Sequence, residues 1–258
     1  MNLKNRTILI TGGSAGLGLA MANELVSMGN TVIICGRNAN RLAQVKKDNP
    51  ELHTIVCDVS DESSINTLLT EIKRDFPSLD IVINNAGVMH LHDVANNSLS
   101  LTHQQQEIQT NFFGVVAICD NFIPLLKQQR SAAIINISSG LAYMPFMAAP
   151  VYAATKAAIH SYSQSIRQSL AGSSVKVIEA LPPMIDTDMT DGLEMDGIPK
   201  MSPEALASVI IKKVAAGKKE IRPGASAMMI SMYKLFPWII NSMMKKMAPK
   251  MFVDIPEY

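Results

Sequence analysis

The amino-acid sequence predicts a single α/β domain in which helices cover both faces of one doubly wound parallel sheet. Short apolar runs of strand length alternate with helical segments at least five times along the chain, which is the pattern of repeated strand–helix–strand units. A glycine-rich turn directly follows the first of these runs. The 258 residues are 48% hydrophobic, which is enough for one large core. We therefore assign residues 1–258 to one domain.

Charge and cysteine content narrow the function classes. Lys plus Arg total 23 and Asp plus Glu total 22, so the net charge of +1 gives no overall field that recruits nucleic acid or an acidic partner. The three cysteines lie inside apolar runs without the close pairing of a metal site. Residues 1–7 lead straight into an apolar strand and contain no signal-peptide pattern. We expect a cytoplasmic protein that binds a small molecule.

The first predicted strand, residues 8–11, ends in a turn suited to phosphate. Glycines let the backbone approach a pyrophosphate closely, and the amino end of the following helix, which runs to residue 28, favours anions. The spacing differs from the commonest dinucleotide fingerprint, so a purely structural turn is an alternative at this point. The candidate phosphate-binding residues are Gly12, Ser14, Ala15, Gly16, Leu17 and Gly18.

The second predicted strand, residues 31–35, indicates which dinucleotide is bound. An NAD-binding unit usually places an acidic residue near the end of this strand, where it contacts the ribose 2′-hydroxyl. Positions 35–37 contain no acid, and Arg37 instead offers a guanidinium suited to a 2′-phosphate, with Arg41 one helical turn further on. The predicted cofactor is therefore NADP. A solvated surface arginine is the alternative interpretation of Arg37.

The alternation continues through the middle of the chain. Helices are predicted over 40–47, 62–76 and 104–126, and strands over 53–57, 81–83 and 133–137. Small and amide-bearing residues after the strand 81–83 suit the crevice in which doubly wound sheets bind ligands. The polar and small residues that follow or interrupt these elements are Asp58 and Val59, Asn84, Asn85, Ala86 and Gly87, Asn111, and Ser138 and Ser139.

A helix over about residues 150–158 carries the main catalytic candidates. Tyr152 and Lys156 are four residues apart, so they lie on the same face of that helix. A tyrosine has a pKa near 10 in water, and a neighbouring ammonium favours the phenolate. We expect Lys156 to lower the pKa of Tyr152 toward neutrality and to make it a usable acid/base.

The last third of the chain is less regular. A strand over 175–181 stops at Pro182 and Pro183, and the acidic, methionine-containing segment 186–200 is a candidate substrate lid, with a surface loop as the alternative. Ser202 is the expected N-cap of a helix that continues to about residue 216. The Met-rich extension 225–258 is interrupted by Lys234 and Pro237, so no part of it is long enough to span a membrane. We expect it to dock on the enzyme or a second subunit, or alternatively to contact anionic lipid.

The conjunction of these motifs, over about residues 5–190, resembles the short-chain dehydrogenase/reductase family. The matching residues are Thr11 and Gly12, Gly16 to Gly18, Asp58, Asn84 to Gly87, Asn111, Ser139, and Tyr152 with Lys156. Within the family, the segments 12–16, 34–37, 138–142 and 182–187 are most similar to the oxidoreductase type encoded with D-alanylation genes. The resemblance implies a Rossmann-type fold, a homo-oligomer with a dimer as its smallest unit, and a nicotinamide cofactor.

It also implies individual roles. Tyr152 would exchange a proton with the substrate oxygen, Ser139 would hydrogen-bond that oxygen, and Lys156 would bind the nicotinamide ribose, while Asn111 would support a water leading toward solvent. Asp58 and Val59 would contact adenine. The adenosine side would meet Asn85, Ala86 and Gly87, and the carboxamide side would meet Pro182, Ile185 and Thr187.

Several alternatives are weighed against this interpretation. His90 and His92 have no close cysteine and one adjacent acid, so we assign no metal. No nucleophile elbow surrounds Ser138 and Ser139, which argues against a hydrolase. Pro183 replaces the glycine usual in the family, so the resemblance does not determine the path of the loop after the strand 175–181. A non-catalytic NADP-binding sensor and a peripheral membrane reductase of a lipid-like substrate remain rival functions, and the sequence identifies no particular carbonyl or alcohol.

Overall fold

A computed structural model gives the architecture and describes residues 1–91, 94, 100–191, 193 and 199–251. Seven parallel strands form one sheet in the order β3-β2-β1-β4-β5-β6-β7, which confirms the predicted fold class. The strands are β1 (Thr7–Thr11), β2 (Thr31–Gly36), β3 (His53–Val56), β4 (Leu79–Asn84), β5 (Ala132–Ile137), β6 (Val175–Ala180) and β7 (Glu220–Ile221).

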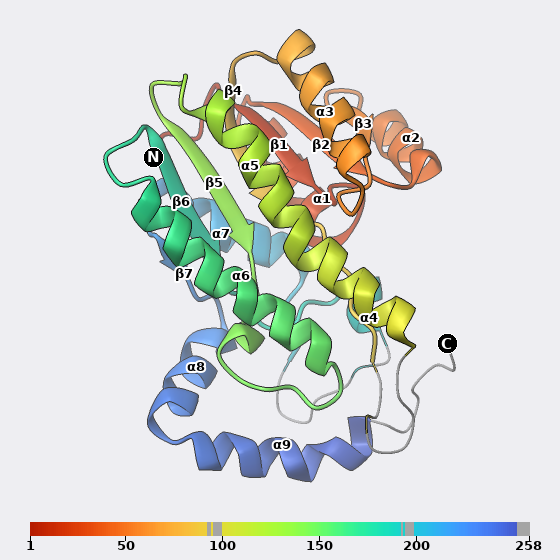
Figure 1. The fold of residues 1–258 in the computed structure, drawn as a ribbon, viewed down its shortest axis with the longest axis vertical. Coiled ribbons are helices and arrows are strands. Elements are labelled where there is room, and N and C mark those ends of the chain that lie inside the picture. Colours follow the sequence, from red (N-terminus) through yellow and green to blue (C-terminus); the bar gives the residue numbers. More distant parts are fainter. Residues whose placement is uncertain (92–93, 95–99, 192, 194–198, 252–258) are drawn as a thin grey trace.

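Helices cover both faces of this sheet (Figure 1). Buried side chains of α1, α2 and α7 pack against one face, and those of α3, α5 and α6 pack against the other. Strands that are buried on both faces must be apolar throughout, as the five buried residues of β1 illustrate. The helices of these two layers are α1 (Gly16–Ser27), α2 (Ala39–Asp48), α3 (Glu62–Asp75), α5 (Gly114–Leu126), α6 (Pro150–Ser169) and α7 (Pro203–Ala215).

The order of the strands places the ligand crevice. From β1 the chain moves outward to β2 and β3, whereas β4 returns to the other side of β1 and continues toward β7. Ligands of open α/β sheets bind outside the carboxyl ends of the strands where this order reverses. The turn after β1 and the turn after β4 are therefore neighbours, although about 70 residues separate them.

The predicted helix over 104–126 is longer than expected and is not uniform. It consists of α4 (Leu101–Ile108), the π-helical turn η1 (Gln109–Phe113) and α5. This run of 26 residues contains an 18-residue window with a mean hydropathy of 1.2, so by length and composition alone it could cross a membrane. Because Ile118, Cys119 and Phe122 are buried against the sheet, we interpret it as a core helix.

The C-terminal extension forms two further helices, α8 (Ala225–Leu235) and α9 (Pro237–Met251), which lie below the sheet in Figure 1. Ile230, Ile240 and Met244 from these helices are buried in a third apolar cluster with Met144 and Phe146. The expected docking on the enzyme's own surface is thus observed for one side of the extension. The other side leaves several large apolar residues exposed, namely Met228, Leu235, Phe236, Trp238 and Ile239.

The candidate lid is only partly within the described residues. Ile185 pairs with Met201 in an isolated parallel bridge, which brings together the two ends of the segment 186–200. Between them lies a short 3-10 turn, η3 (Asp188–Thr190), and the prediction for positions 192 and 194–198 lies outside the described residues. The expected N-cap after this segment is confirmed, because the Ser202 side chain accepts a hydrogen bond from the N–H of Ala205 at 3.3 Å.

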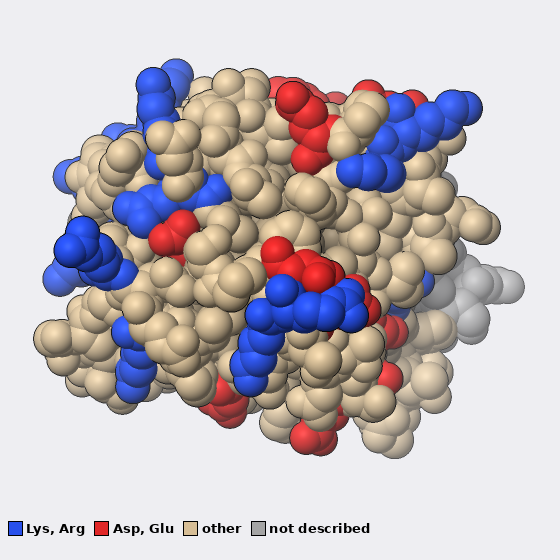
Figure 2. All heavy atoms as spheres, turned by 90° about the horizontal axis from the view of Figure 1, so that it is seen from above, with Lys and Arg blue, Asp and Glu red and all other residues tan. Residues whose placement is uncertain are grey.

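Surface charge agrees with the near-neutral composition. On the face shown in Figure 2, basic and acidic side chains are interspersed and several stand next to one another. Such a surface provides no single-sign field that steers a polyanion.

Candidate active site

The turn after β1 has the shape that close approach of a ligand requires. Gly12 has a φ of +64°, and a Cβ atom at this position would lie 2.8 Å from the Cα atom of Ala86. A Cβ atom at Gly18 would lie 2.3 Å from the carbonyl oxygen of Gly12. Any side chain at either position would displace the backbone. Only glycine satisfies both positions.

The amino end of α1 is open to an anion. Its N-cap, Ala15, makes no side-chain hydrogen bond to the first turn, and that turn contains no acidic residue. The first N–H groups of a helix need partners, and their aligned dipoles favour negative charge. The turn Gly12–Gly18 therefore fits the pyrophosphate of a dinucleotide.

Thr11 and Asn85 hold the turns after β1 and β4 together. The Thr11 hydroxyl oxygen accepts hydrogen bonds from the N–H groups of Asn85 at 3.0 Å and Ala86 at 3.1 Å. In return the Asn85 side-chain amide donates to the carbonyl oxygens of Thr11 and Gly12, both at 3.1 Å. These four bonds fix the floor of the crevice, a role of Thr11 that follows only from the fold.

A cleft of about 680 Å³ opens above this floor and brings most predicted cofactor residues together. Predicted residues that line it are Gly12, Ala15, Gly16, Leu17, Asn85, Ala86, Gly87, Tyr152, Lys156, Pro182, Ile185 and Thr187. Predicted residues outside its lining are Ser14, Gly18, Arg37, Asp58 and Val59. Gly18 still shapes the turn through its close approach to Gly12.

The arginines near β2 are placed differently from the sequence expectation. Arg41, on α2, lines the cleft, whereas Arg37 is exposed on the turn before that helix. The Arg41 guanidinium lies 3.8 Å from the carboxylate of Asp188, across the cleft on η3. Both side chains are more than half exposed, so this ion pair is weak. Arg41 is therefore the better-placed cation for a phosphate in the cleft.

Tyr152 and Lys156 share one face of α6, as predicted from their spacing. The Lys156 ammonium lies 5.4 Å from the centroid of the Tyr152 ring and donates a hydrogen bond to the carbonyl oxygen of Ile137 at 3.1 Å. Ser139 follows β5, and its hydroxyl oxygen accepts a hydrogen bond from the N–H of Leu141 at 3.1 Å. All three side chains thus lie at the carboxyl ends of the central strands.

The pKa of Tyr152 differs from the sequence expectation. Burial raises it to about 12, a hydrogen bond with Ser139 opposes this shift, and the Glu107 carboxylate adds to it. We expected Lys156 to lower the pKa of Tyr152 toward neutrality, but burial is the largest effect on that pKa in this structure. Tyr152 is consequently a protonated phenol at neutral pH, which is the form that donates a proton.

Asn111 lies in the π-helical turn η1 and is completely buried. Its side-chain oxygen accepts from the N–H of Val88 at 2.8 Å, and its amide donates to the carbonyl oxygen of Val88 at 2.8 Å and to the hydroxyl of Thr155 at 3.3 Å. It therefore connects the segment after β4 to α6. Through that connection it helps to position the Tyr152 and Lys156 helix.

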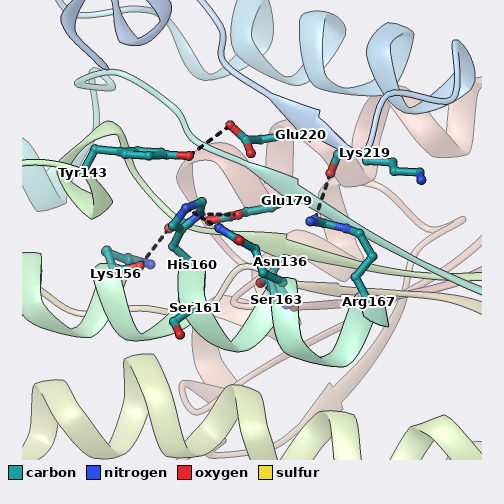
Figure 3. Close-up of polar contacts among 12 residues, drawn as sticks. Asn136, Tyr143, Lys156, His160, Ser161, Ser163, Arg167, Glu179, Lys219 and Glu220 are labelled. Atoms are coloured by element: carbon teal, nitrogen blue, oxygen red, sulfur yellow. Dashed lines mark hydrogen bonds and ion pairs between the residues drawn. The ribbon is translucent and has the colours of Figure 1, made fainter. Parts of the chain in front are cut away.

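A polar network extends along α6 from Lys156 (Figure 3). His160, one turn further on, has its Nδ1 atom 2.8 Å from the carboxylate of Glu179, a fully buried residue on β6. Burial lowers the pKa of Lys156 to about 8, and the negative charge of Glu179 raises it. Glu179 thus helps to keep the buried ammonium charged.

This network also contains a group of potential metal ligands. Ligand atoms of His160, Glu179 and Glu220 lie within 4.8 Å of one another. Arg222 donates a hydrogen bond to the carboxylate of Glu220 and compensates its charge. With Lys156 also adjacent, a divalent cation would meet positive groups on two sides, so we assign no metal here.

Glu107, on α4, is a buried acid that the sequence interpretation did not identify. It is fully buried, and one of its oxygens has no hydrogen-bond partner among the described residues. Burial raises its pKa to about 7, although a hydrogen bond from the N–H of His90 lowers it. Glu107 precedes Tyr152 by 45 residues, and its burial depends on how the chain folds. No local sequence pattern therefore marks it as part of the site.

A second cavity, of about 120 Å³, meets the cofactor cleft at Tyr152. Ser139 and Tyr152 both line it, together with Pro182, Pro183 and residues of α8 and α9. Pro183, the departure from the family pattern, also packs toward Gly224 at the start of α8. The loop after β6 therefore passes between the two hollows.

The raised pKa of Glu107 predicts a pH dependence of stability. A carboxyl group whose pKa is raised by folding stabilises the fold while it is protonated, and that contribution is lost as the pH rises through about 7. Glu107→Gln cannot ionise. Its melting temperature relative to the parent protein should therefore increase between pH 5 and pH 8. Melting curves of both proteins, with the exposed Glu51→Gln as a control, measure this, and a pH-independent difference contradicts it.

Comparison with known proteins agrees with this geometry. The chain is 41% identical over 227 residues to the uncharacterized oxidoreductase DltE of Bacillus subtilis, covering 86% of this chain and 89% of that protein. It is 34% identical over 185 residues to serine 3-dehydrogenase of Agrobacterium fabrum, covering 71% of this chain and 74% of that protein. A short chain dehydrogenase from Burkholderia cenocepacia, solved in complex with NADP, shares the fold with a TM-score of 0.84 at 22% identity, covering 95% and 99% of the two chains. The family description "short chain dehydrogenase" matches residues 6–196, and the chain belongs to this oxidoreductase family.

Proposed function

We propose that this chain is an NADP-dependent oxidoreductase that transfers a hydride between the nicotinamide and a carbonyl/alcohol pair. One observation carries the proposal: Tyr152 lines both hollows, with Lys156 in the cofactor cleft and Ser139 in the second cavity. A substrate in the second cavity would thus meet the proton donor at the edge of the cofactor cleft. This arrangement supports a reaction in which the cofactor and the proton donor Tyr152 must act on the same carbonyl group.

The residues of the chain would supply binding and proton transfer. When bound, the cofactor supplies the hydride. Ser139 and Tyr152 would donate hydrogen bonds to the substrate carbonyl oxygen, and Tyr152 would transfer its proton to that oxygen during reduction. Burial disfavours the resulting phenolate. The neighbouring Lys156 ammonium would offset this cost, because a nearby positive charge favours the ionised form. Asn111 would maintain the spacing of these groups by fixing α6.

The proposed acid predicts the effect of removing one hydroxyl. Tyr152→Phe should lower the turnover of a carbonyl substrate at least about a hundredfold, the lower end of general acid–base contributions. NADPH binding should change little. Absorbance assays with a panel of aldehydes and ketones measure turnover, and Tyr162→Phe removes a hydroxyl from the same helix as a matched control. If Tyr152→Phe retains most of the activity, another group is the acid.

The cofactor preference is a separate prediction. NADPH should bind at least about tenfold tighter than NADH, which corresponds to about 1.4 kcal/mol and lies within the reach of one charge-assisted contact to phosphate. Arg41→Ala should remove most of this preference, and Arg37→Ala tests the residue that the sequence favoured. Fluorescence titrations with both cofactors measure the affinities, with Arg74→Ala on α3 as a control. Equal affinities of the parent protein for both cofactors would refute the assignment.

A second candidate function, a peripheral membrane reductase, is supported by the exposed side of the C-terminal extension. Leu235, Phe236, Trp238 and Ile239 stand exposed where α8 meets α9, and Lys245 and Lys246 are exposed further along α9. Apolar and basic residues together suit the surface of an anionic bilayer. Cosedimentation with anionic vesicles at low salt, lost at high salt and in Trp238→Ser, is the expected result. Absence of sedimentation at low salt excludes this function.

A further inference from the structure

The second cavity has a chemical character that restricts the substrate. Its walls are formed mainly by methionine and other apolar side chains from the loops after β4, β5 and β6 and from α8 and α9. Among the described residues, none that lines it carries a charge. The apolar lining residues include Met89, Leu141, Met144, Phe146, Met184, Met189, Leu193, Met229 and Met244.

Burial makes this absence of charge consequential. Met144, Phe146, Leu193 and Met244 are each less than 6% exposed, so the part of the lining that the structure describes offers a bound molecule no compensating charge. Transfer of a carboxylate or an ammonium group into such a site is strongly unfavourable. Methionine side chains adapt their shape to an apolar ligand at little cost. The cavity therefore selects uncharged, apolar groups.

Five polar side chains also line the cavity, and four of them have other tasks or partners. Ser139 and Tyr152 face the reacting oxygen in the proposed reaction, and the Thr190 hydroxyl donates to backbone carbonyl oxygens of its own turn. Thr187 lies on the side shared with the cofactor cleft. The remaining one is Ser226, in the first turn of α8.

Ser226 has an unused hydrogen-bonding group. The residue is 1% exposed, and its hydroxyl has no hydrogen-bond partner among the described residues. A Cβ atom on Gly140 would lie only 3.0 Å from this hydroxyl, so it stands directly against the loop that carries Ser139. A buried hydroxyl without a partner is unfavourable unless a ligand or water completes it. The hydroxyl is thus placed to meet a second polar atom of a molecule held at Ser139 and Tyr152.

We propose that the substrate is an uncharged carbonyl compound, or its alcohol, with an apolar body and a second oxygen or nitrogen that hydrogen-bonds to Ser226. This inference rests on the proposed function, because it takes the second cavity as the substrate site. The same reasoning argues against amino acids and keto acids, since no described residue of the lining offers a partner for their charged groups. The C-terminal extension is then a specificity element, because Ser226, Met229 and Met244 come from α8 and α9.

Equilibrium binding tests the charge rule without requiring turnover. Titration calorimetry with 2-octanone and 7-oxooctanoate, which differ in a terminal carboxylate, is carried out on the full chain with and without NADP⁺. We expect 2-octanone to bind at least about tenfold tighter than 7-oxooctanoate, a difference of about 1.4 kcal/mol. Equal affinities, tighter 7-oxooctanoate, or no binding of 2-octanone would overturn the inference.

Two neighbouring methionines provide a matched pair of variants. Met229 lines the cavity, whereas Met228 is 62% exposed on the same helix. Met229→Lys should weaken 2-octanone binding at least about tenfold and reverse the preference toward 7-oxooctanoate, whereas Met228→Lys should leave both affinities within about twofold. The parent protein's own preference stays a valid test if Met229→Lys does not fold. If Met229→Lys and Met228→Lys have identical effects, Met229 does not line the substrate site.

A third ligand tests Ser226. Ser226→Ala should weaken binding of 4-hydroxyoctan-2-one, which has two oxygens, about tenfold, while the affinity for 2-octanone stays within about twofold. Equal losses for both ligands mean that Ser226 only supports the structure.

Turnover separates this inference from the proposed function. The expected binding pattern without NADPH consumption by any carbonyl refutes the oxidoreductase proposal but retains the cavity's chemistry. Efficient reduction of charged carbonyls supports the oxidoreductase proposal and refutes the inference that the cavity selects uncharged substrates.

Discussion

The buried ammonium of Lys156 is the constraint on which the rest of the site depends. Lys156 is 5% exposed, so the fold must supply partners that replace water around a full positive charge. The carbonyl oxygen of Ile137 accepts one hydrogen bond from it, and the carboxylate of Glu179 lowers the electrostatic cost of keeping it charged. The end of β5, the strand β6 and the helix α6 are thereby tied to one charged atom. Tyr152, on the same helix, and Ser139, directly after β5, take their positions from this arrangement.

Opposing electrostatic demands meet at Tyr152. Burial raises the pKa of Tyr152 and protects its proton, whereas the hydrogen bond with Ser139 favours the removal of that proton. Glu107 adds a negative charge to the same region and titrates near neutrality. The site therefore brings together three ionisable groups with shifted pKa values, Glu107, Tyr152 and Lys156, and such groups cluster at functional sites.

Local chemistry explains what the sequence could predict. The glycine turn, the helical spacing of Tyr152 and Lys156, and the N-cap Ser202 each depend on neighbours within a few residues, and all appear as predicted. The missed residues depend on contacts across the fold. His160 meets Glu179 from another element, and Ser226 approaches Gly140 from 86 positions away. The sequence could not show that Arg41 rather than Arg37 lines the cleft, because the path of the turn after β2 decides which side chain reaches it. The homo-oligomer and the cytoplasmic location stay predictions.

The bridge between Ile185 and Met201 has a consequence for the evolution of related chains. It closes the base of the segment 186–200, so the chain leaves and re-enters the domain at nearly the same point. For a loop whose ends are already held together, doubling its length adds only about 0.6 kcal/mol of closure entropy. Added length in this segment therefore costs little closure entropy, whereas exchange of the buried Leu193 would remove packing from the wall of the second cavity. Under the proposed function, variation in this segment beyond residues 186–189, which line the cofactor cleft, is a route to altered substrates that leaves the cofactor contacts in place.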